Sequence, residues 1–268
     1  MTATNQERNA KPSEDLRVFE AASQGDLEAI EALLRDGAPA STRSFDGQTP
    51  LMAAVKLGRA DCVRRLLGVC DPLALTHQEQ DALDIALSEG KAECVKILAP
   101  VSDNRPDRRA QRLRDLINKH NNPRALDCMD AFAPTPDDVR NKGPAGMDAL
   151  MLASMRRKMG MLERLLPLGD PSSLSDDGRS AFDYGLPAPF EVRRPSGYAC
   201  ADRLAETVSA EKLRKVVEAL GAEHMPRAAA LIEAWDLRAV ADQAANSAGG
   251  AAFRAAPSAA ANKKAQRI

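Results

Sequence analysis

The sequence is poor in aromatic residues and has no long apolar run. Phe, Trp and Tyr make up only 3% of its 268 residues. A core made mainly of Leu, Ala, Val, Ile and Met favours closely packed small helices over a β-sandwich or barrel. No stretch of 18 apolar residues is present, and the opening residues 1–16 are polar. The sequence therefore predicts neither a membrane span nor a cleaved signal peptide.

Motifs for catalysis and metal binding are also missing. The chain has no CxxC, GxSxG, HExxH or phosphate-binding Gly-Lys-Ser/Thr segment, and its three histidines are far apart. An odd, dispersed set of cysteines predicts reduced thiols in a cytosol. We therefore expect a cytoplasmic protein that is not an enzyme and has no cofactor or metal, with delivery as an effector left open. The cysteines are Cys62, Cys70, Cys94, Cys128 and Cys200.

Charge gives no general reason to expect nucleic acid as a partner, because the net charge is only -1. One stretch, residues 104–120, is locally basic and contains only two acids. It is either a docking patch for an acidic partner or nucleic acid, or the solvated face of a helix. No aromatic residue lies in it to stack on a base, which disfavours nucleic acid. Its six cations are Arg105, Arg108, Arg109, Arg112, Arg114 and Lys119.

A repeated pattern dominates the chain. The stretch at residues 46–67, DGQTPLMAAVKLGRADCVRRLL, recurs in weaker form at intervals of about 33 residues. The apolar residues of the two helices expected in this stretch have counterparts 33 positions earlier in the chain and again 32 and 99 positions later. Such a period predicts a stack of similar repeats. One position of the pattern, usually leucine, is held by Val18, Leu51, Leu83 and Leu150. Another, always alanine in these four repeats, is held by Ala21, Ala54, Ala86 and Ala153.

Each repeat has the pattern of two short antiparallel helices followed by a loop. Thr49 can be the N-cap of the first helix, and Pro50 then occupies its first position. Ala54 is small because that helix lies against the next repeat, and Leu66 fills the space between layers. Gly58 allows a left-handed turn between the helices. A repeat of this kind cannot bury its apolar face alone, so it is stabilised by its neighbours.

These residues resemble an ankyrin repeat, whose pattern is D-x-x-G-x-T-P-L-H-x-A, then a helix ending in LL and a G-A turn. The resemblance is strong over residues 14–102, moderate over 145–185 and weak elsewhere. It implies an all-α, ankyrin-like helix-turn-helix solenoid with projecting loops, about six repeats long, with a helical C-terminal cap. The family's histidine, which ties adjacent loops together, is absent throughout. Its slots hold Phe19, Met52, Asp84, Ile117, Met151 and Asp183.

The pattern divides the chain into four parts. Residues 1–13 are a flexible lead, and residues 14–185 are the repeats. The fourth repeat, 104–143, is degenerate, because Lys119 and Pro123 replace its alanine and glycine. A Pro-rich insertion and a helical cap follow over 186–245. Residues 246–268 are Ala-rich and basic, and their composition predicts disorder.

The resemblance also implies where a protein partner would bind, namely in the loops and on the exposed side of the first helices. Phe45 is the favoured anchor, because aromatic residues and Arg dominate binding energies at interfaces. It either projects from its loop tip or folds back on the stack. We expect these residues to contact the partner: Arg43, Phe45, Gln48, Lys56, His77, Gln78, Gln80 and Ser88.

The favoured function is therefore a non-enzymatic scaffold or adaptor for an unidentified protein partner. Two alternatives use the irregular segments 104–145 or 186–246: an enzyme, whose site could combine Cys128 with His120, or a nucleic-acid-associated accessory factor. The oligomeric state is left open.

Overall fold

A computed structural model describes residues 16–119, 124–186 and 198–254 of the chain. Every regular element in these residues is a helix. The chain divides into two compact units, an N-terminal part, Met1–Leu186, and a C-terminal part, Pro187–Ile268. The prediction of an all-α helical-repeat fold is confirmed. None of the described helices has both the length and the apolar character needed to cross a membrane.

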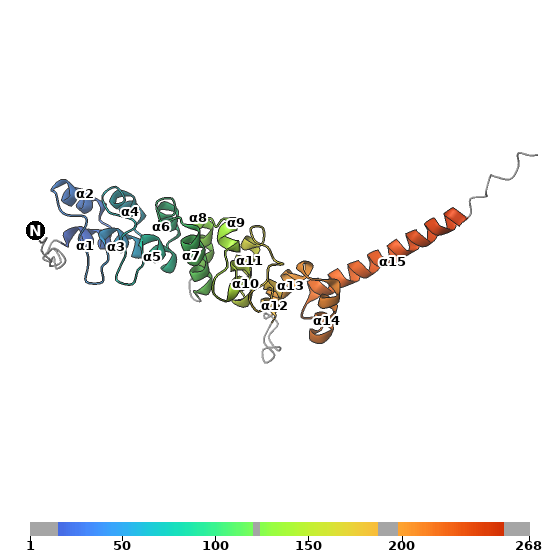
Figure 1. Ribbon diagram of the computed structural model, residues 1–268. Helices are drawn as coiled ribbons and strands as arrows, with labels where there is room; N and C mark the ends of the chain where they lie inside the picture. Colours follow the sequence, from blue (N-terminus) through green and yellow to red (C-terminus); the bar gives the residue numbers. More distant parts are fainter. Residues whose placement is uncertain (1–15, 120–123, 187–197, 255–268) are drawn as a thin grey trace, which may run out of the picture. The chain divides into compact units, whose positions relative to one another are not determined.

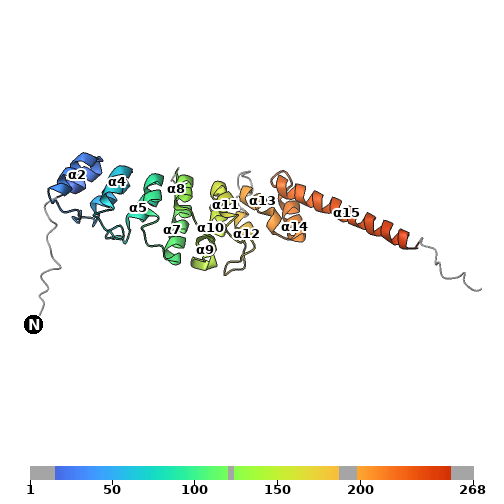
Figure 2. The ribbon, with the colours of Figure 1, turned by 90° about the horizontal axis from the view of Figure 1, so that it is seen from above.

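The N-terminal part consists of helix pairs stacked in two rows. Figure 1 shows α1, α3 and α5 side by side in one row and α2, α4 and α6 in the other. Figure 2 shows the successive pairs of this part from above. The first three pairs are α1 (Arg17–Gln24), α2 (Leu27–Arg35), α3 (Pro50–Lys56), α4 (Ala60–Leu66), α5 (Ala82–Ser88) and α6 (Ala92–Leu98). The later elements are α7 (Pro106–Asn118), α8 (Ala125–Phe132), α9 (Pro136–Arg140), η2 (Pro144–Gly146), α10 (Ala149–Met155), α11 (Met159–Leu165) and α12 (Ala181–Gly185).

The core lies where the periodic slots place it. Leu51 and Ala54 of α3 are completely buried, as are Leu83 and Ala86 of α5. The alanine slot admits only a small side chain because α3 packs directly against both α1 and α5. In the second helices of the first, second, third and fifth repeats, the fully buried residues are Ile30, Val63, Leu66, Val95, Leu98, Leu162 and Leu165.

The first helices begin at side-chain caps. Thr49 accepts a hydrogen bond from the backbone N–H of Met52 at 3.3 Å, and Pro50 follows at the first helical position. Asp81 and Asp148 occupy the same place before α5 and α10, and each accepts from the N–H three residues on at 2.9 Å. These oxygens satisfy helix N–H groups that have no partner within the helix, which fixes where each first helix begins.

The fourth repeat is built differently. Its first helix, α7, is 13 residues long, whereas α3 and α5 have seven each. The pattern placed Leu116 near the start of a first helix that would continue through Lys119. In the structure α7 begins ten residues before Leu116, at Pro106, and ends at Asn118, so Lys119 is its C-cap. The second helix is α8, and α9 is an additional short helix packed on α7.

The C-terminal part contains α13 (Ala199–Arg203), η4 (Ala205–Thr207), α14 (Ala210–Leu220) and α15 (Pro226–Arg254). Leu213, Met225 and Ala228 are fully buried there, and the rings of Tyr198 and His224 stack 5.3 Å apart. Residues 246–254, for which composition predicted disorder, belong to α15. Three of these nine residues are alanine, which has the highest helix propensity, but Gly249 and Gly250 oppose a helix, so propensity alone does not account for the continuation. The predicted lead, 1–13, and residues 255–268 lie outside the described residues.

Candidate functional site

Two neighbouring loop tips form the edge of the candidate site. Ser44 and Gln48 close the first tip through a backbone hydrogen bond of 2.9 Å, and Thr76 and Gln80 close the second in the same way at 2.9 Å. Each tip needs one residue with positive φ, supplied by Gly47 in the first and by Glu79 in the second. The two tips are therefore the same tight turn, repeated 32 positions apart.

The tips are tied to one another through the backbone and through Arg43. The guanidinium Nη1 of Arg43 donates to the carbonyl of Leu75 at 2.7 Å and to that of Gly47 at 3.2 Å. The N–H of His77 also donates to the carbonyl of Asp46 at 3.3 Å. Arg43, which the resemblance placed among the partner contacts, thus spans two loops. It makes loop-to-loop contacts in a chain that lacks the family's histidine.

A cleft lies between the tips and the first helices α3 and α5. Its volume is about 450 Å³. Seven of the eight residues expected to contact a partner line it, and Arg43 does not. The seven are Phe45, Gln48, Lys56, His77, Gln78, Gln80 and Ser88.

Phe45 projects from the rim of this cleft. Its side chain is 95% exposed, so it does not fold back on the stack. Exposing a whole phenylalanine ring to water gives up the free energy of burying it, roughly 1.5–3 kcal/mol. The ring is therefore available to pack against another molecule.

A second cleft continues from the first along α7. Its volume is about 520 Å³, and it shares Gln78, Gln80 and Ser88 with the first. On its far side it is lined by α7 residues, among them Arg108, Gln111, Arg112, Asp115 and Lys119. The two clefts together run over the second, third and fourth repeats.

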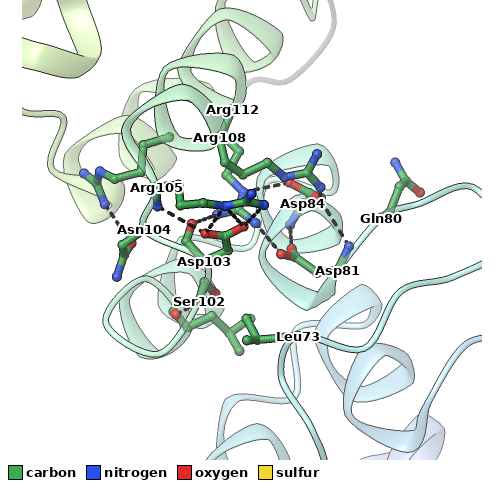
Figure 3. Close-up of polar contacts among 12 residues, drawn as sticks. Leu73, Gln80, Asp81, Asp84, Ser102, Asp103, Asn104, Arg105, Arg108 and Arg112 are labelled. Atoms are coloured by element: carbon green, nitrogen blue, oxygen red, sulfur yellow. Dashed lines mark hydrogen bonds and ion pairs between the residues drawn. The ribbon is translucent and has the colours of Figure 1, made fainter.

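The wall of the second cleft is held by a network of arginines and aspartates (Figure 3). Arg112, only 2% exposed, donates from Nε to Asp84 at 2.8 Å and from Nη1 to the carbonyl of Asp103 at 2.8 Å. Its Nη2 forms an ion pair with the buried Asp81. Arg108 pairs with the other oxygen of Asp84. A buried charge is tolerated only when it is paired and hydrogen-bonded, as these are.

Other cations of the basic stretch are engaged in the same manner. Arg109 pairs with Asp138 at 3.0 Å, and its guanidinium lies 4.5 Å from the centre of the Phe132 ring. Arg114 donates to the carbonyl of Asn141 at 3.0 Å. Arg105 pairs with Asp103 at 2.6 Å, and this hydrogen bond lowers the pKa of Asp103 to about 2. Five of the six cations therefore have carboxylate or carbonyl partners within the protein.

The hydroxyl of Ser88 and the thiol of Cys128 are both held in structural surroundings. The hydroxyl of Ser88 donates to the carbonyl of Ile85 at 3.0 Å, so it is not directed at a base. Cys128 is completely buried, and burial raises the pKa of its thiol to about 11, which keeps it unreactive. His120 lies outside the described residues. Within the described part of the chain, no group of three His, Cys, Asp or Glu residues could hold a metal ion.

Sequence reasoning missed the arginine network because its partners are distant in the chain. Arg112 lies 31 residues after Asp81 and 28 after Asp84. A signal was present nevertheless: Asp81 and Asp84 hold the slots of the threonine and histidine of the repeat pattern. Two acids in slots that are usually uncharged, one repeat before an arginine-rich helix, indicate pairing between the repeats.

Comparison with known proteins gives a family match for the first repeats. Residues 18–109 match the family model for ankyrin repeats in three copies. The ankyrin repeat domain-containing protein oryK of Aspergillus oryzae is 32% identical to this chain over 83 residues, which are 31% of this chain. The chain spans only 13% of the length of that relative.

Solved structures show the same fold over a longer stretch. A chain in the complex of the Bd0816 predatory endopeptidase from Bdellovibrio bacteriovorus with immunity protein Bd3460 superposes with a TM-score of 0.51 at 17% identity. The match covers 70% of this chain and 97% of that one. The human ASB11 ankyrin repeat domain gives a TM-score of 0.50 at 17% identity, covering 70% of this chain and 96% of its own. At this identity the likeness concerns the fold alone.

Proposed function

We propose that this ankyrin repeat protein is a non-enzymatic adaptor that binds a protein partner in the clefts of its second to fourth repeats. The observation that carries the proposal is the convergence of Phe45, Gln48, Gln78 and Gln80 on one cleft with an almost fully exposed aromatic ring at its rim. Ankyrin repeats generally act as protein-interaction modules, which supports the same function. The free, buried state of all five cysteines suits a reducing compartment such as the cytoplasm.

The chemistry of the cleft suits a polypeptide. The carboxamides of Gln48, Gln78 and Gln80 can each donate and accept hydrogen bonds, as the peptide groups of a partner require. Phe45 offers apolar area at small entropic cost, because its side chain has only two rotatable bonds. Lys56 and Glu89 lie on the same surface and add charge of both signs. This combination of an aromatic anchor with polar groups around it is typical of protein interfaces.

The test is the affinity of Phe45→Ala for a partner first recovered by affinity capture and then purified. An anchor residue of this kind contributes about 2 kcal/mol or more, so the dissociation constant should rise about thirtyfold. The fold should be unaffected, because the ring packs on nothing within the chain that would be lost.

Leu174→Ala is the matched control. Leu174 is also an exposed apolar residue in a loop, 51% exposed, but it belongs to the fifth repeat and does not line either cleft. Its substitution should leave the affinity unchanged. If Phe45→Ala and Leu174→Ala bind equally well, the proposed surface is wrong.

A further inference from the structure

A second pair of loop tips, at 143–147 and 175–179, lies 99 positions after the pair that borders the clefts. The tip at 143–147 closes through a hydrogen bond from the N–H of Gly143 to the carbonyl of Met147 at 2.8 Å. The tip at 175–179 closes in the same way at 3.0 Å. The chain therefore contains two pairs of adjacent tips with the same backbone arrangement.

A cation joins the tips of each pair. In the first pair, the guanidinium of Arg43 donates to the carbonyl of Leu75 at 2.7 Å. In the second pair, the ammonium of Lys142 donates to the carbonyl of Leu174, also at 2.7 Å. Each residue of the second contact lies 99 positions after its counterpart in the first. Hydrogen bonds from a charged donor are stronger than those between neutral groups. Two different side chains thus make the same contact, so it is a feature of the paired tips.

Backbone groups of the two tips also meet in each pair. The N–H of His77 donates to the carbonyl of Asp46 at 3.3 Å, and the N–H of Asp176 donates to the carbonyl of Ala145 at 3.1 Å. In the first pair the approach is close enough that a β-carbon on Gly47 would lie 2.8 Å from the imidazole of His77. These contacts require the tips to stay at a fixed separation, which the cation maintains.

The first pair of tips carries residues that line the clefts. Phe45 and Gln48 belong to one tip, and Gln78 and Gln80 belong to the other. Arg43 does not line either cleft. The separation of the two tips therefore sets the distance between the aromatic ring and the glutamines of the other tip. Loops that are already held in one arrangement lose less conformational entropy when a partner docks.

We propose that Arg43 is a positioning residue for the clefts, which holds the two tips so that Phe45 and the glutamines face a partner together. Arg43 does not itself touch the partner. This role rests on the proposed function, because positioning affects binding only if a partner docks in the clefts. Lys142 ties the second pair of tips in the same way. In a chain without the family's histidine, these cations supply the contact between adjacent loops.

The first experiment measures the hydrogen exchange of two backbone N–H groups, those of His77 and Asp176, by NMR on the full chain. Arg43→Met removes the donors but keeps an unbranched side chain. The exchange of His77 should become about two- to tenfold faster, the effect of one hydrogen bond, while that of Asp176 stays unchanged. Lys142→Met should do the reverse. Arg43→Lys should keep the exchange of His77 near that of the parent, because a lysine makes this contact at position 142.

The second experiment measures affinity for the same purified partner protein with which Phe45→Ala is tested. Arg43→Met should raise the dissociation constant about two- to tenfold, and Arg43→Lys should restore most of the affinity. Lys142→Met is the matched control and should leave the affinity unchanged. In a chain that already carries Phe45→Ala, Arg43→Met should weaken binding clearly less, because the tip no longer presents the ring.

Three results would overturn the positioning role of Arg43. One is unchanged exchange of His77 in Arg43→Met, or faster exchange of both His77 and Asp176, which would indicate a general loss of stability. Another is unchanged affinity of Arg43→Met where Phe45→Ala weakens binding. The last is an effect of Arg43→Met that is equally large with and without Phe45, which would make Arg43 a direct contact. If Phe45→Ala binds as tightly as the parent, the proposed function fails, whereas the exchange of His77 still decides whether Arg43 ties the tips.

Discussion

The second and third repeats differ from the fourth in what joins each to its neighbours. In the former, the seven-residue helices α3 and α5 meet through fully buried small residues, Ala54 and Ala86. In the latter, the longer helix α7 reaches α5 of the third repeat through Arg112, and Arg109 ties α7 to α9 within the fourth repeat. An apolar helix surface can pack against any other repeat that has an apolar surface, whereas a buried arginine requires a carboxylate at one position of the neighbouring repeat. The fourth repeat is therefore specific to its place in the stack.

The cap before each first helix shows the same contrast. Thr49, Asp81 and Asp148 hold equivalent positions, and each accepts a hydrogen bond from the backbone three residues on. All three are nearly buried. Thr49 is neutral, Asp81 is charged and paired with Arg112, and no ion pair is found for Asp148 among the described residues. One structural task is thus performed by three side chains whose electrostatic surroundings differ.

The largest effect is expected from Arg112→Met. The substitution fills a similar volume but leaves the carboxylate of Asp81, which is 2% exposed, without its cation. Removing one partner of a buried pair destabilises a protein by about 3–5 kcal/mol. Chemical denaturation followed by circular dichroism measures the loss.

A second variant tests whether the pair replaces a neutral cap. Arg112→Met combined with Asp81→Thr restores the cap that Thr49 provides in the second repeat, and removes the unpaired charge. Asp84 keeps Arg108 as its partner. The double variant should regain most of the lost stability. If it is as unstable as Arg112→Met alone, the pair does more than replace a neutral cap.

Leu66→Ala should have the next largest effect, in the regular part of the stack. Leu66 is completely buried between the second helices, whereas its neighbour Leu67 is only half-buried. The cavity left by Leu66→Ala should destabilise by about 2–5 kcal/mol, as measured by denaturant titration. Leu67→Ala should cost clearly less. If the two variants lost the same free energy of unfolding, the conclusion that Leu66 lies in the core and Leu67 does not would be wrong.

The sequence predicted the regular repeats well because their contacts are periodic. Leu51, Leu83 and Leu150 could be placed in the core from spacing alone, since a stacked repeat presents the same face each time. The same reasoning failed for α7, where Leu116 was assigned to the start of a helix and lies near its end. Its length and its arginine contacts depend on partners 24–31 residues away, which no local period reveals.

The candidate clefts were predictable for a related reason. Residues such as Gln48 and Gln80 repeat at 32 positions, so residues that correspond in the pattern lie side by side in the fold. What spacing could not supply is the direction of a side chain. Phe45 could project or fold back, and Arg43 bonds to carbonyl oxygens of both loops. Whether these residues contact a partner stays a prediction.

The smallest effect, and the one that separates Asp148 from Thr49, is a dependence of stability on pH. Burial raises the pKa of Asp148 above its usual 3.8, although the N–H of Met151 donates to it. Well below pH 3.8 the carboxyl is protonated in both states, and as pH rises from there through the raised pKa the folded state loses stability relative to the unfolded state. Asn caps a helix as well as Asp but does not titrate. Asp148→Asn should therefore be more stable than the parent at pH 7 and equal to it near pH 3. Asp26→Asn, at the exposed cap of α2, controls for the loss of one negative charge. Denaturation midpoints of the three proteins across this range measure the difference, and a constant gap between Asp148→Asn and the parent would refute the effect of burial.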